Sequence, residues 1–373
     1  MATNTDFILA TTERVRRAAE SGNCLRIRGG GSKDFYGESL EGELLDTSPL
    51  NGVVSYEPSE LVVTALAGTP LAELEALLLA QGQCLPFEPP HLNPGATLGG
   101  MVAAGLSGPA RASAGAVRDF VLGVKLINGK GEHLTFGGQV MKNVAGYDVS
   151  RLMVGAMGTL GLLTEVSMKV LPIAPLEATL KFEMLQAQAL MQLNTWGGQP
   201  LPLNASCWVN EDSKENGKGT LYLRLRGAVA AVESACAKLG GERLPQVQAA
   251  SDWKLCRDQQ LPWFNERTDT QDLWRLSVPQ TTPVLELPDS PLIEWHGGQR
   301  WVRAEQSQGE KLRALAQAAG GHATLFIAAS TRKQGVMLRF DTLKPPLDRI
   351  QRELKREFDS SGVFNPHRIH ADW

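Results

Sequence analysis

Apolar residues recur along the first half of the chain at two spacings, one typical of a helix face and one typical of a strand. Thr69 is the expected N-cap of one helix, with Pro70 at its first position, because a threonine hydroxyl accepts an N-terminal amide and proline needs no donor there. The helix should stop at Gly82. The predicted elements are helices at 6–21 and from 69 to 82, and strands at 24–27, 62–66, 120–126 and 163–170. This alternation indicates an α+β fold.

A proline-bounded segment at 172–175 predicts a linker between two domains. Beyond it, a strand at 221–225 and a helix at 228–239 favour a smaller α/β cap domain. The leucine, isoleucine and phenylalanine spacing at 347–358 predicts a last helix. We therefore divide the chain into three parts. These are a first domain at 1–173, a cap at 174–343, and a C-terminal helix with its tail at 344–373, which packs back on the first domain.

Composition excludes several classes of protein. The 373 residues carry a formal net charge of −3, which gives no reason to expect a nucleic-acid partner. The N-terminus lacks the basic and apolar runs of a secretory signal, and no apolar stretch reaches the ~18–20 residues of a membrane span. The five cysteines are scattered without a C-x-x-C pair, so the chain should hold no iron–sulfur cluster by itself and fits a reducing cytoplasm.

All eight tryptophans follow the linker. We interpret them first as core residues. Because tryptophan is enriched where proteins dock, a partner surface in this half is the alternative.

Three consecutive glycines at 29–31 follow the first predicted strand. Glycine lets backbone amides converge on an anion, so this run predicts a phosphate or pyrophosphate site, with a tight structural turn as the alternative. The spacing fits neither a Walker loop nor a dinucleotide G-x-G-x-x-G fingerprint. Two further segments, at 91–105 and 154–166, are rich in glycine and small residues and would let a flat ligand lie against the backbone.

In this order, the three segments and the closing run at 358–366 resemble the vanillyl-alcohol oxidase superfamily, whose FAD-binding domain is of the p-cresol methylhydroxylase type. The resemblance implies a two-subdomain FAD-binding domain at 1–173. More narrowly, the runs at 142–148, 274–276 and 295–301 resemble the E-type FAD-binding subunits of glycolate oxidase.

The resemblance also implies which residues bind FAD. The backbone at 29–32 would hold the pyrophosphate, 94–100 would line the flavin, and the third segment would lie against the adenosine. Ser32 stands where a covalently attached flavin would need a nearby histidine, so FAD should be dissociable. The implied FAD-binding residues are Arg28, Gly29, Gly30, Gly31, Ser32, Lys33, Pro94, Gly95, Thr97, Gly99, Gly100, Arg111, Gly115, Gly158, Gly161, Leu163 and Asn365.

Oxidation of a 2-hydroxy acid needs a cation for the carboxylate and a base for the hydroxyl proton. Arg275, Arg300 and Arg303 are candidates for the cation, and we select Arg275. His296 is the candidate base, with a packing role in a turn as its alternative. The histidine pair that binds a metal in related D-2-hydroxy-acid dehydrogenases is absent, so we expect no metal.

The resemblance implies a multi-subunit glycolate oxidase. Its members would be this chain, a sister flavoprotein and an iron–sulfur subunit, in the cytoplasm, with any attachment to the inner face of the membrane made through those partners. The substrate would be glycolate or another short D-2-hydroxy acid such as D-lactate. The alternative is an FAD-holding electron-relay or assembly subunit whose sister does the substrate chemistry. A stand-alone D-lactate dehydrogenase is a third reading.

Overall fold

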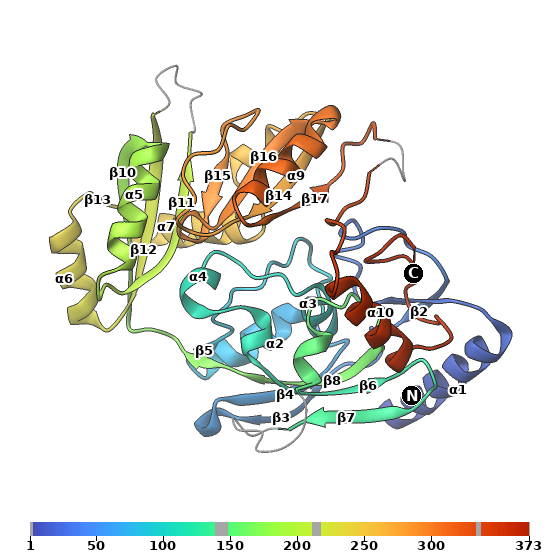
Figure 1. Ribbon diagram of the computed structural model, residues 1–373. Helices are drawn as coiled ribbons and strands as arrows, with labels where there is room; N and C mark the ends of the chain where they lie inside the picture. Colours follow the sequence, from blue (N-terminus) through green and yellow to red (C-terminus); the bar gives the residue numbers. More distant parts are fainter. Residues whose placement is uncertain (1–2, 139–147, 211–217, 333–336, 373) are drawn as a thin grey trace.

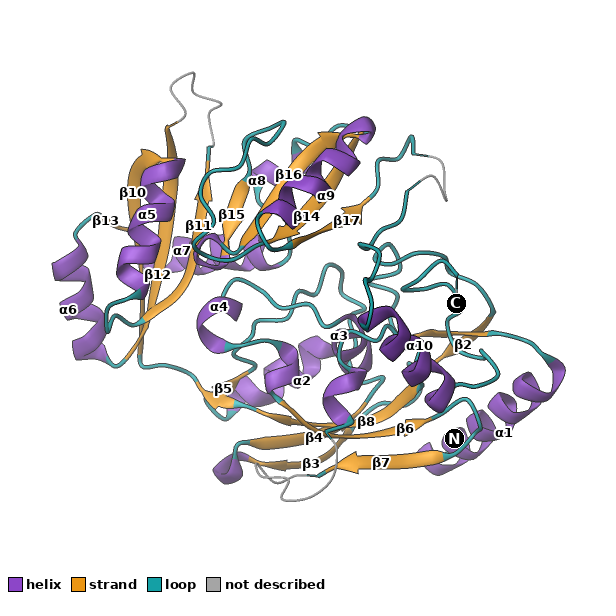
Figure 2. Ribbon diagram, in the orientation of Figure 1, coloured by secondary structure: helices purple, strands orange, loops and turns teal. Residues whose placement is uncertain are grey.

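The computed structural model describes residues 3–138, 148–210, 218–332 and 337–372. Two sheets lie in separate lobes (Figures 1 and 2). The first lobe comprises residues 3–172 and the C-terminal segment 347–372, and the second lobe comprises residues 176–327. The predicted boundary at 173 falls between the last strand of one lobe and the first strand of the other.

A five-stranded antiparallel sheet, in the order β3-β4-β8-β6-β7, forms the base of the first lobe, and a small parallel pair, β1-β2, lies beside α1. The leucines of α2 and the apolar residues of α3 pack on the large sheet. The elements are α1 (Asn4–Ser21), β1 (Leu25–Arg28), β2 (Glu43–Asp46), β3 (Val53–Glu57), β4 (Val62–Leu66), α2 (Leu71–Ala80), β5 (Gln83–Cys84), α3 (Leu98–Ala104), α4 (Arg111–Ala114), β6 (Val121–Ile127), β7 (His133–Gly137), β8 (Leu162–Lys169) and β9 (Leu171–Pro172).

The second lobe is built on an eight-stranded sheet in the order β13-β10-β12-β11-β15-β16-β14-β17, and every pairing in it is antiparallel. The expected strand–helix alternation is present along the chain, within a sheet whose strands are antiparallel. The elements are β10 (Leu176–Leu185), α5 (Gln186–Gly197), β11 (Leu203–Val209), β12 (Lys218–Gly227), α6 (Val229–Leu239), β13 (Glu242–Arg243), α7 (Gln246–Arg257), α8 (Pro262–Asn265), β14 (Gln271–Ser277), β15 (Leu292–Glu294), β16 (Gln299–Glu305), α9 (Gly309–Ala318) and β17 (His322–Ile327).

Side chains alternate between the two faces of this sheet, and each face has its own core. Trp208 and Trp274 pack on the outer face, with α5, α6 and α9. Trp301 packs on the inner face, with α7, α8 and residues of the first lobe such as Tyr36 and Leu106. The inner face is thus the part of the second lobe that meets the first lobe.

The C-terminal segment returns to the first lobe through α10 (Leu347–Phe358), drawn dark red in Figure 1. Lys355 Nζ donates to Asp359 Oδ2 at 2.6 Å and to the Thr159 carbonyl at 2.7 Å. Leu25 of β1 donates its amide to the Val363 carbonyl at 2.7 Å and so adds this segment to the β1 edge. Two apolar residues of the predicted stripe on α10, Leu347 and Ile350, are exposed rather than buried.

Most expected elements lie within one or two residues of their predicted ends, and the α+β class is confirmed. The N-cap at Thr69 is wrong: α2 begins one residue later than expected, and the Thr69 hydroxyl instead bonds to the Gly52 backbone. The seven tryptophans within the described residues are all buried, as core residues should be. The run at 142–148 lies outside the described residues, apart from Asp148.

Candidate active site

Two adjoining hollows of about 520 and 590 Å³ form one crevice across the first lobe. The glycine loop after β1 lines one end, and the segment before β8 lines the other. Six residues belong to both hollows and make the crevice continuous: Ile27, Gly29, Gly100, Ala103, Met157 and Asn365.

The glycine loop packs directly against the segment that leads into α3. A Cβ on Gly30 would stand 1.4 Å from the Gly95 carbonyl oxygen, and one on Gly29 would stand 2.4 Å from Thr97 Oγ1. Gly31 has φ of 70°, a left-handed conformation that glycine adopts without strain. These glycines therefore bring main chain, rather than side chains, to the wall of the crevice.

Asn365 ties the C-terminal segment to both ends of the crevice. Its Oδ1 accepts the Ile27 amide at 2.7 Å, and its Nδ2 donates to the Met157 carbonyl at 2.6 Å. Arg368, one turn further on, donates to the carbonyls of Asp34, Tyr36 and Glu38 behind the glycine loop. The C-terminal segment thus fixes the loop that carries the three glycines.

Lys33 is the cation in the glycine loop, and burial lowers the pKa of its ammonium to about 8. Its Nζ donates to Ser32 Oγ at 3.1 Å. No carboxylate of the described residues lies within ion-pair distance of it. A half-buried ammonium beside converging backbone amides fits a diphosphate, whose charge would compensate it.

The structure brings most of the expected FAD-binding residues together. The residues that line the crevice are Arg28, Gly29, Gly30, Gly31, Ser32, Lys33, Thr97, Gly99, Gly100, Gly158, Gly161, Leu163 and Asn365. Four others lie outside it. Gly95 backs the glycine loop and Pro94 is exposed, whereas Gly115 forms a turn against Asp119 and Arg111 stacks on Trp295.

Six crevice residues had no signal in the sequence analysis, namely Tyr36, Leu40, Thr47, Ala67, Met153 and Arg368. Four more, Ala103, Ala104, Ala156 and Met157, lie within the flagged segments 91–105 and 154–166 but were not selected individually. Most are ordinary apolar residues, which nothing in sequence separates from core. Arg368 lies two residues beyond the closing run at 358–366.

Arg275 lies on the inner face of the second lobe, directly above the crevice. Its Nη2 donates to Tyr36 Oη at 3.1 Å, and Tyr36 lines the crevice. The guanidinium also lies near the Tyr36 and Phe326 rings, at 5.8 and 5.7 Å. No carboxylate of the described residues pairs with it, so this arginine has the geometry to take an anionic ligand.

The other two candidate arginines already bind other groups of the protein. Arg300 is completely buried on the outer face and donates to the carbonyls of Thr282 and Pro283, and burial lowers its pKa to about 10. Arg303 pairs with Asp289 and Glu266. The structure therefore favours Arg275 among the three.

His296 lies in the turn between β15 and β16 and connects the two lobes. Its Nδ1 lies 3.0 Å from Ser206 Oγ, and its Nε2 lies 3.0 Å from Ser113 Oγ of α4. Ser206 Oγ also accepts the His296 amide, so its own proton is available for Nδ1, and Nε2–H then donates to Ser113. Burial lowers the pKa of the imidazole to about 4, so the ring is neutral near pH 7.

The imidazole of His296 stands in a strained turn, since both Trp295 and His296 have positive φ. Both ring nitrogens already make hydrogen bonds. The geometry of His296 therefore fits a packing role in the turn better than the role of a free base.

Among the described residues, no three His, Cys, Asp or Glu side chains are grouped so that they could hold a metal ion.

The fold and the glycine-lined crevice define an FAD-linked oxidoreductase, and residues 10–137 match the model of the FAD binding domain family. Along nearly its whole length, the chain is 43% identical over 367 residues to the glycolate oxidase subunit GlcE of Escherichia coli, covering 98% of each protein. The chain therefore belongs to the glycolate oxidase subunit GlcE family, and it binds FAD.

Two further similarities have lower sequence identity. The chain is 30% identical to the glycolate oxidase subunit GlcD of Bacillus subtilis over 123 residues, which is 33% of this chain and 26% of that protein. Alkyldihydroxyacetonephosphate synthase shares the fold, with a TM-score of 0.65 at 16% identity over 96% of this chain and 75% of its own. Of the helices that the structure describes, none has both the length and the apolarity needed to cross a bilayer.

Proposed function

We propose that this chain is the FAD-binding subunit of a multi-subunit glycolate oxidase. It oxidises glycolate, and other short D-2-hydroxy acids such as D-lactate, to the 2-oxo acid and passes the electrons to an iron–sulfur subunit. The observation that carries the proposal is the continuous crevice behind the glycine loop, in a chain that matches a glycolate oxidase subunit from end to end.

The residues of the crevice would hold FAD by its diphosphate and rings. Backbone amides at Gly29, Gly30 and Gly31, with Lys33, would bind the diphosphate. Gly158, Gly161 and Leu163 would contact a flat ring from the opposite wall. When bound, FAD supplies a two-electron acceptor for the carbon that carries the substrate hydroxyl.

The second lobe would hold the substrate above the flavin. Arg275 would pair with the carboxylate, because its planar fork matches the two oxygens. His296 is neutral near pH 7 and would either accept the hydroxyl proton or position Ser113 and α4.

FAD should be dissociable, because Ser32 occupies the loop where a covalent attachment would need a histidine. Acid precipitation of the purified protein should leave the flavin in the supernatant. Flavin that stays with the pellet would contradict this.

The proposed assembly would contain a sister flavoprotein and an iron–sulfur subunit. The five cysteines are free and scattered, so the thiolates of a cluster would have to come from a partner. Copurification of the chain with such partners, followed by metal analysis of the complex and of the chain alone, tests this assignment.

An electron-relay or assembly subunit is the second candidate. It is favoured by the engagement of both His296 ring nitrogens, which leaves that side chain without a free lone pair for substrate. In this case the sister flavoprotein would oxidise the substrate, and this FAD would carry electrons.

An anaerobic flavin spectrum separates the two candidates. Glycolate is added to the FAD-loaded chain alone and then to the chain with its partners. Bleaching of the isolated chain is the expected result and shows that it has its own hydroxy-acid site. Bleaching only in the complex would favour the relay.

A further inference from the structure

The part of the glycine loop that follows the three glycines, segment 33–38, has no regular structure of its own. None of its residues belongs to a helix or a strand. The Asp34 amide donates to the Gly31 carbonyl at 3.3 Å, and the Tyr36 amide donates to the Lys33 carbonyl at 3.0 Å. Ordering such a segment costs conformational entropy that these two bonds do not offset. Its position therefore depends on contacts from elsewhere in the chain.

The side chain of Arg368 lies inside segment 33–38 and is only 7% exposed. Carbonyls of the segment converge on its guanidinium, one on Nη1 and the others on Nη2. They belong to Lys33, Asp34, Tyr36 and Glu38. Gly37 permits this approach, because its φ is 108° and a Cβ there would stand 3.0 Å from Arg368 Cζ. One side chain thus fixes the orientation of several peptide groups directly after the glycines.

The guanidinium of Arg368 is charged and has no carboxylate partner among the described residues. Burial lowers its pKa to about 10, so it is protonated near pH 7. Arg368 and the half-buried Lys33 line the same hollow of the crevice, and neither forms an ion pair within the described part of the chain. Because charges withdrawn from water need compensation, two such cations beside backbone amides favour a doubly charged anion.

The backbone that carries Arg368 is held without help from this side chain. Asp359 accepts the amides of Val363 and Phe364 at 2.9 and 2.8 Å, and both of these apolar residues are completely buried. Asn365 bonds to both ends of the crevice. Removal of the guanidinium should therefore release segment 33–38 and leave the C-terminal segment in place.

We propose that Arg368 is a positioning residue for the cofactor, and that its guanidinium holds segment 33–38 in the arrangement that lets Lys33 and the glycine amides bind the FAD diphosphate. Retention of FAD then depends on one side chain of the C-terminal segment. The role concerns the cofactor alone, so it holds whether this chain or a sister flavoprotein oxidises the substrate.

Equilibrium titration of FAD into the flavin-free full chain tests this role without turnover. Arg368→Ala should bind FAD at least about tenfold more weakly than wild type, because the segment is no longer held. Arg300→Ala is the matched control, since Arg300 is also a buried arginine that donates to backbone carbonyls but lies in the second lobe. Far-ultraviolet circular dichroism compares the folding of the two variants. Wild-type affinity in Arg368→Ala, or equal losses in both variants, would overturn the proposal.

Arg368→Lys separates positioning from charge. Lysine keeps the charge but lacks the planar fork that bridges several carbonyls, so this variant should bind FAD with an affinity closer to that of Arg368→Ala than to that of wild type. Wild-type affinity in Arg368→Lys would show that the charge suffices and would contradict a positioning role. If Arg368→Ala does not fold, Arg368→Lys, which retains most of the buried stem, carries the test.

Chemical rescue separates positioning from a general loss of structure. Methylguanidinium, at concentrations that do not unfold the protein, should restore part of the FAD affinity of Arg368→Ala, because the ion can occupy the space among the carbonyls. It should restore none of the affinity of Lys33→Met, where those carbonyls still bind Arg368. Rescue of both variants, or of neither, would contradict the role assigned to the guanidinium.

Discussion

The crevice of the first lobe and the inner face of the second lobe are built by opposite means. The crevice is made largely of main chain and small residues, brought close by glycines that nothing larger could replace. The inner face presents long polar side chains from separate strands, with Arg275, Gln299 and Glu294 as its members above the crevice. Short runs of neighbouring residues form the crevice, whereas the alignment of separate strands brings the side chains of the inner face together.

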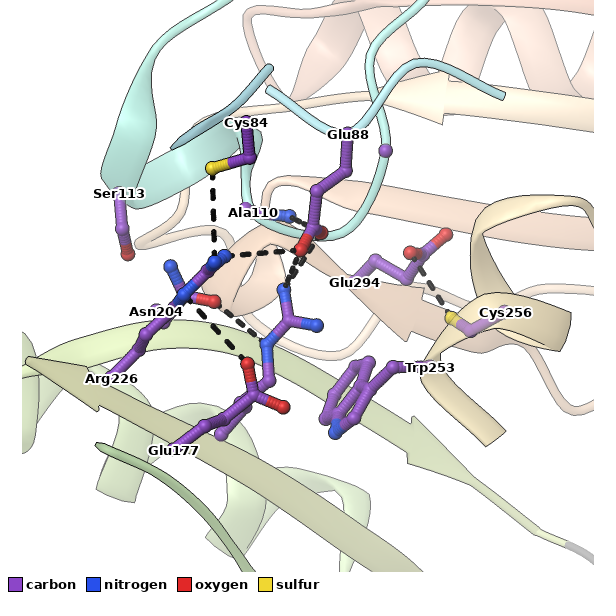
Figure 3. Close-up of polar contacts among 12 residues, drawn as sticks. Cys84, Glu88, Ala110, Ser113, Glu177, Asn204, Arg226, Trp253, Cys256 and Glu294 are labelled. Atoms are coloured by element: carbon purple, nitrogen blue, oxygen red, sulfur yellow. Dashed lines mark hydrogen bonds and ion pairs between the residues drawn. The ribbon is translucent and has the colours of Figure 1, made fainter. Parts of the chain in front are cut away.

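The two regions meet at a shared apolar core and at several polar contacts. Tyr36 connects the crevice to Arg275, and Glu88 of the first lobe reaches the second-lobe sheet (Figure 3). Because the two sites belong to different lobes, the distance between a bound flavin and a substrate depends on these contacts. A variant at the junction should therefore affect both sites, whereas a variant within one site should affect that site alone.

The largest effect should come from breaking the junction at Glu88. Its carboxylate accepts both 2.7 Å contacts from Arg224, a side chain that is only 4% exposed, and it also bonds to the Ala110 amide. Glu88→Gln would leave a buried guanidinium without its counter-ion, which should cost about 3 kcal/mol or more of unfolding free energy. Urea unfolding of the full chain measures this.

Glu233→Gln is the control, since it removes an exposed ion pair with Arg243 and should change stability little. Equal losses in the two variants would mean that the Glu88 contact does not hold the lobes together.

The next largest effect should be at Gly30 in the crevice. A Cβ there would meet the Gly95 carbonyl at 1.4 Å, so Gly30→Ala should separate the glycine loop from its neighbouring segment. We expect a loss of about 1–3 kcal/mol in stability and of most of the bound FAD. The FAD-to-protein ratio after gel filtration reports the second effect.

Gly197→Ala is the matched control, because a Cβ at Gly197 meets nothing within 4 Å. A Gly30→Ala protein that retains a full complement of FAD would show that the loop does not form part of the cofactor site.

The contrast between the regions also explains what the sequence could predict. The glycine runs identified most of the crevice, because a backbone conformation that only glycine tolerates is visible in a few consecutive letters. Asn365 was selected because the closing run at 358–366 resembles that of the FAD-binding superfamily. The apolar wall was located only as far as its segments, 91–105 and 154–166, because single residues in it such as Ala103 and Met157 look like any core residues.

The inner face could not be predicted to the same extent. Arg275, Arg300 and Arg303 look equivalent in sequence, but in the structure Leu276 pairs with Arg300 and Arg275 pairs with Trp301. One residue of register therefore decides which arginine faces the crevice and which faces away. Glu294 and Gln299 face each other across β15 and β16, so no local motif marks the pair.

A smaller effect should appear at the His296 turn. Asparagine tolerates positive φ, so His296→Asn should preserve the turn but lose the hydrogen bond to Ser113. The His296 pKa is about 4 in the folded chain and near 6.5 when unfolded, so the folded state binds fewer protons between these values. Wild-type stability should therefore fall as pH falls through this window, by at most about 1.4 kcal/mol per pH unit.

The variant lacks this titration, so its deficit relative to wild type should shrink from pH 7 to pH 4. Chemical unfolding of both proteins at several pH values measures the difference, in which the other histidines cancel. A deficit that is constant with pH would show that His296 is not buried as a neutral ring.

The smallest effect concerns the charge in the crevice. Lys33→Met should weaken FAD binding by about tenfold at pH 7, because a charge-assisted contact to the diphosphate is lost while the glycine loop remains.

The same side chain should make FAD binding depend on pH. Burial lowers the Lys33 pKa to about 8 in the free chain, so the wild-type ammonium loses its proton above that pH. FAD favours the protonated form, and its affinity should then fall by about tenfold in total as the pH rises from 8 to 10. Lys130→Met, at an exposed position, should keep this pH dependence, and Lys33→Met should lose it. Equilibrium titration of FAD into the flavin-free protein, followed by fluorescence from pH 7 to 10, measures all three proteins. The same pH dependence in Lys33→Met would assign the titrating group elsewhere and leave the backbone amides as the main ligands of the diphosphate.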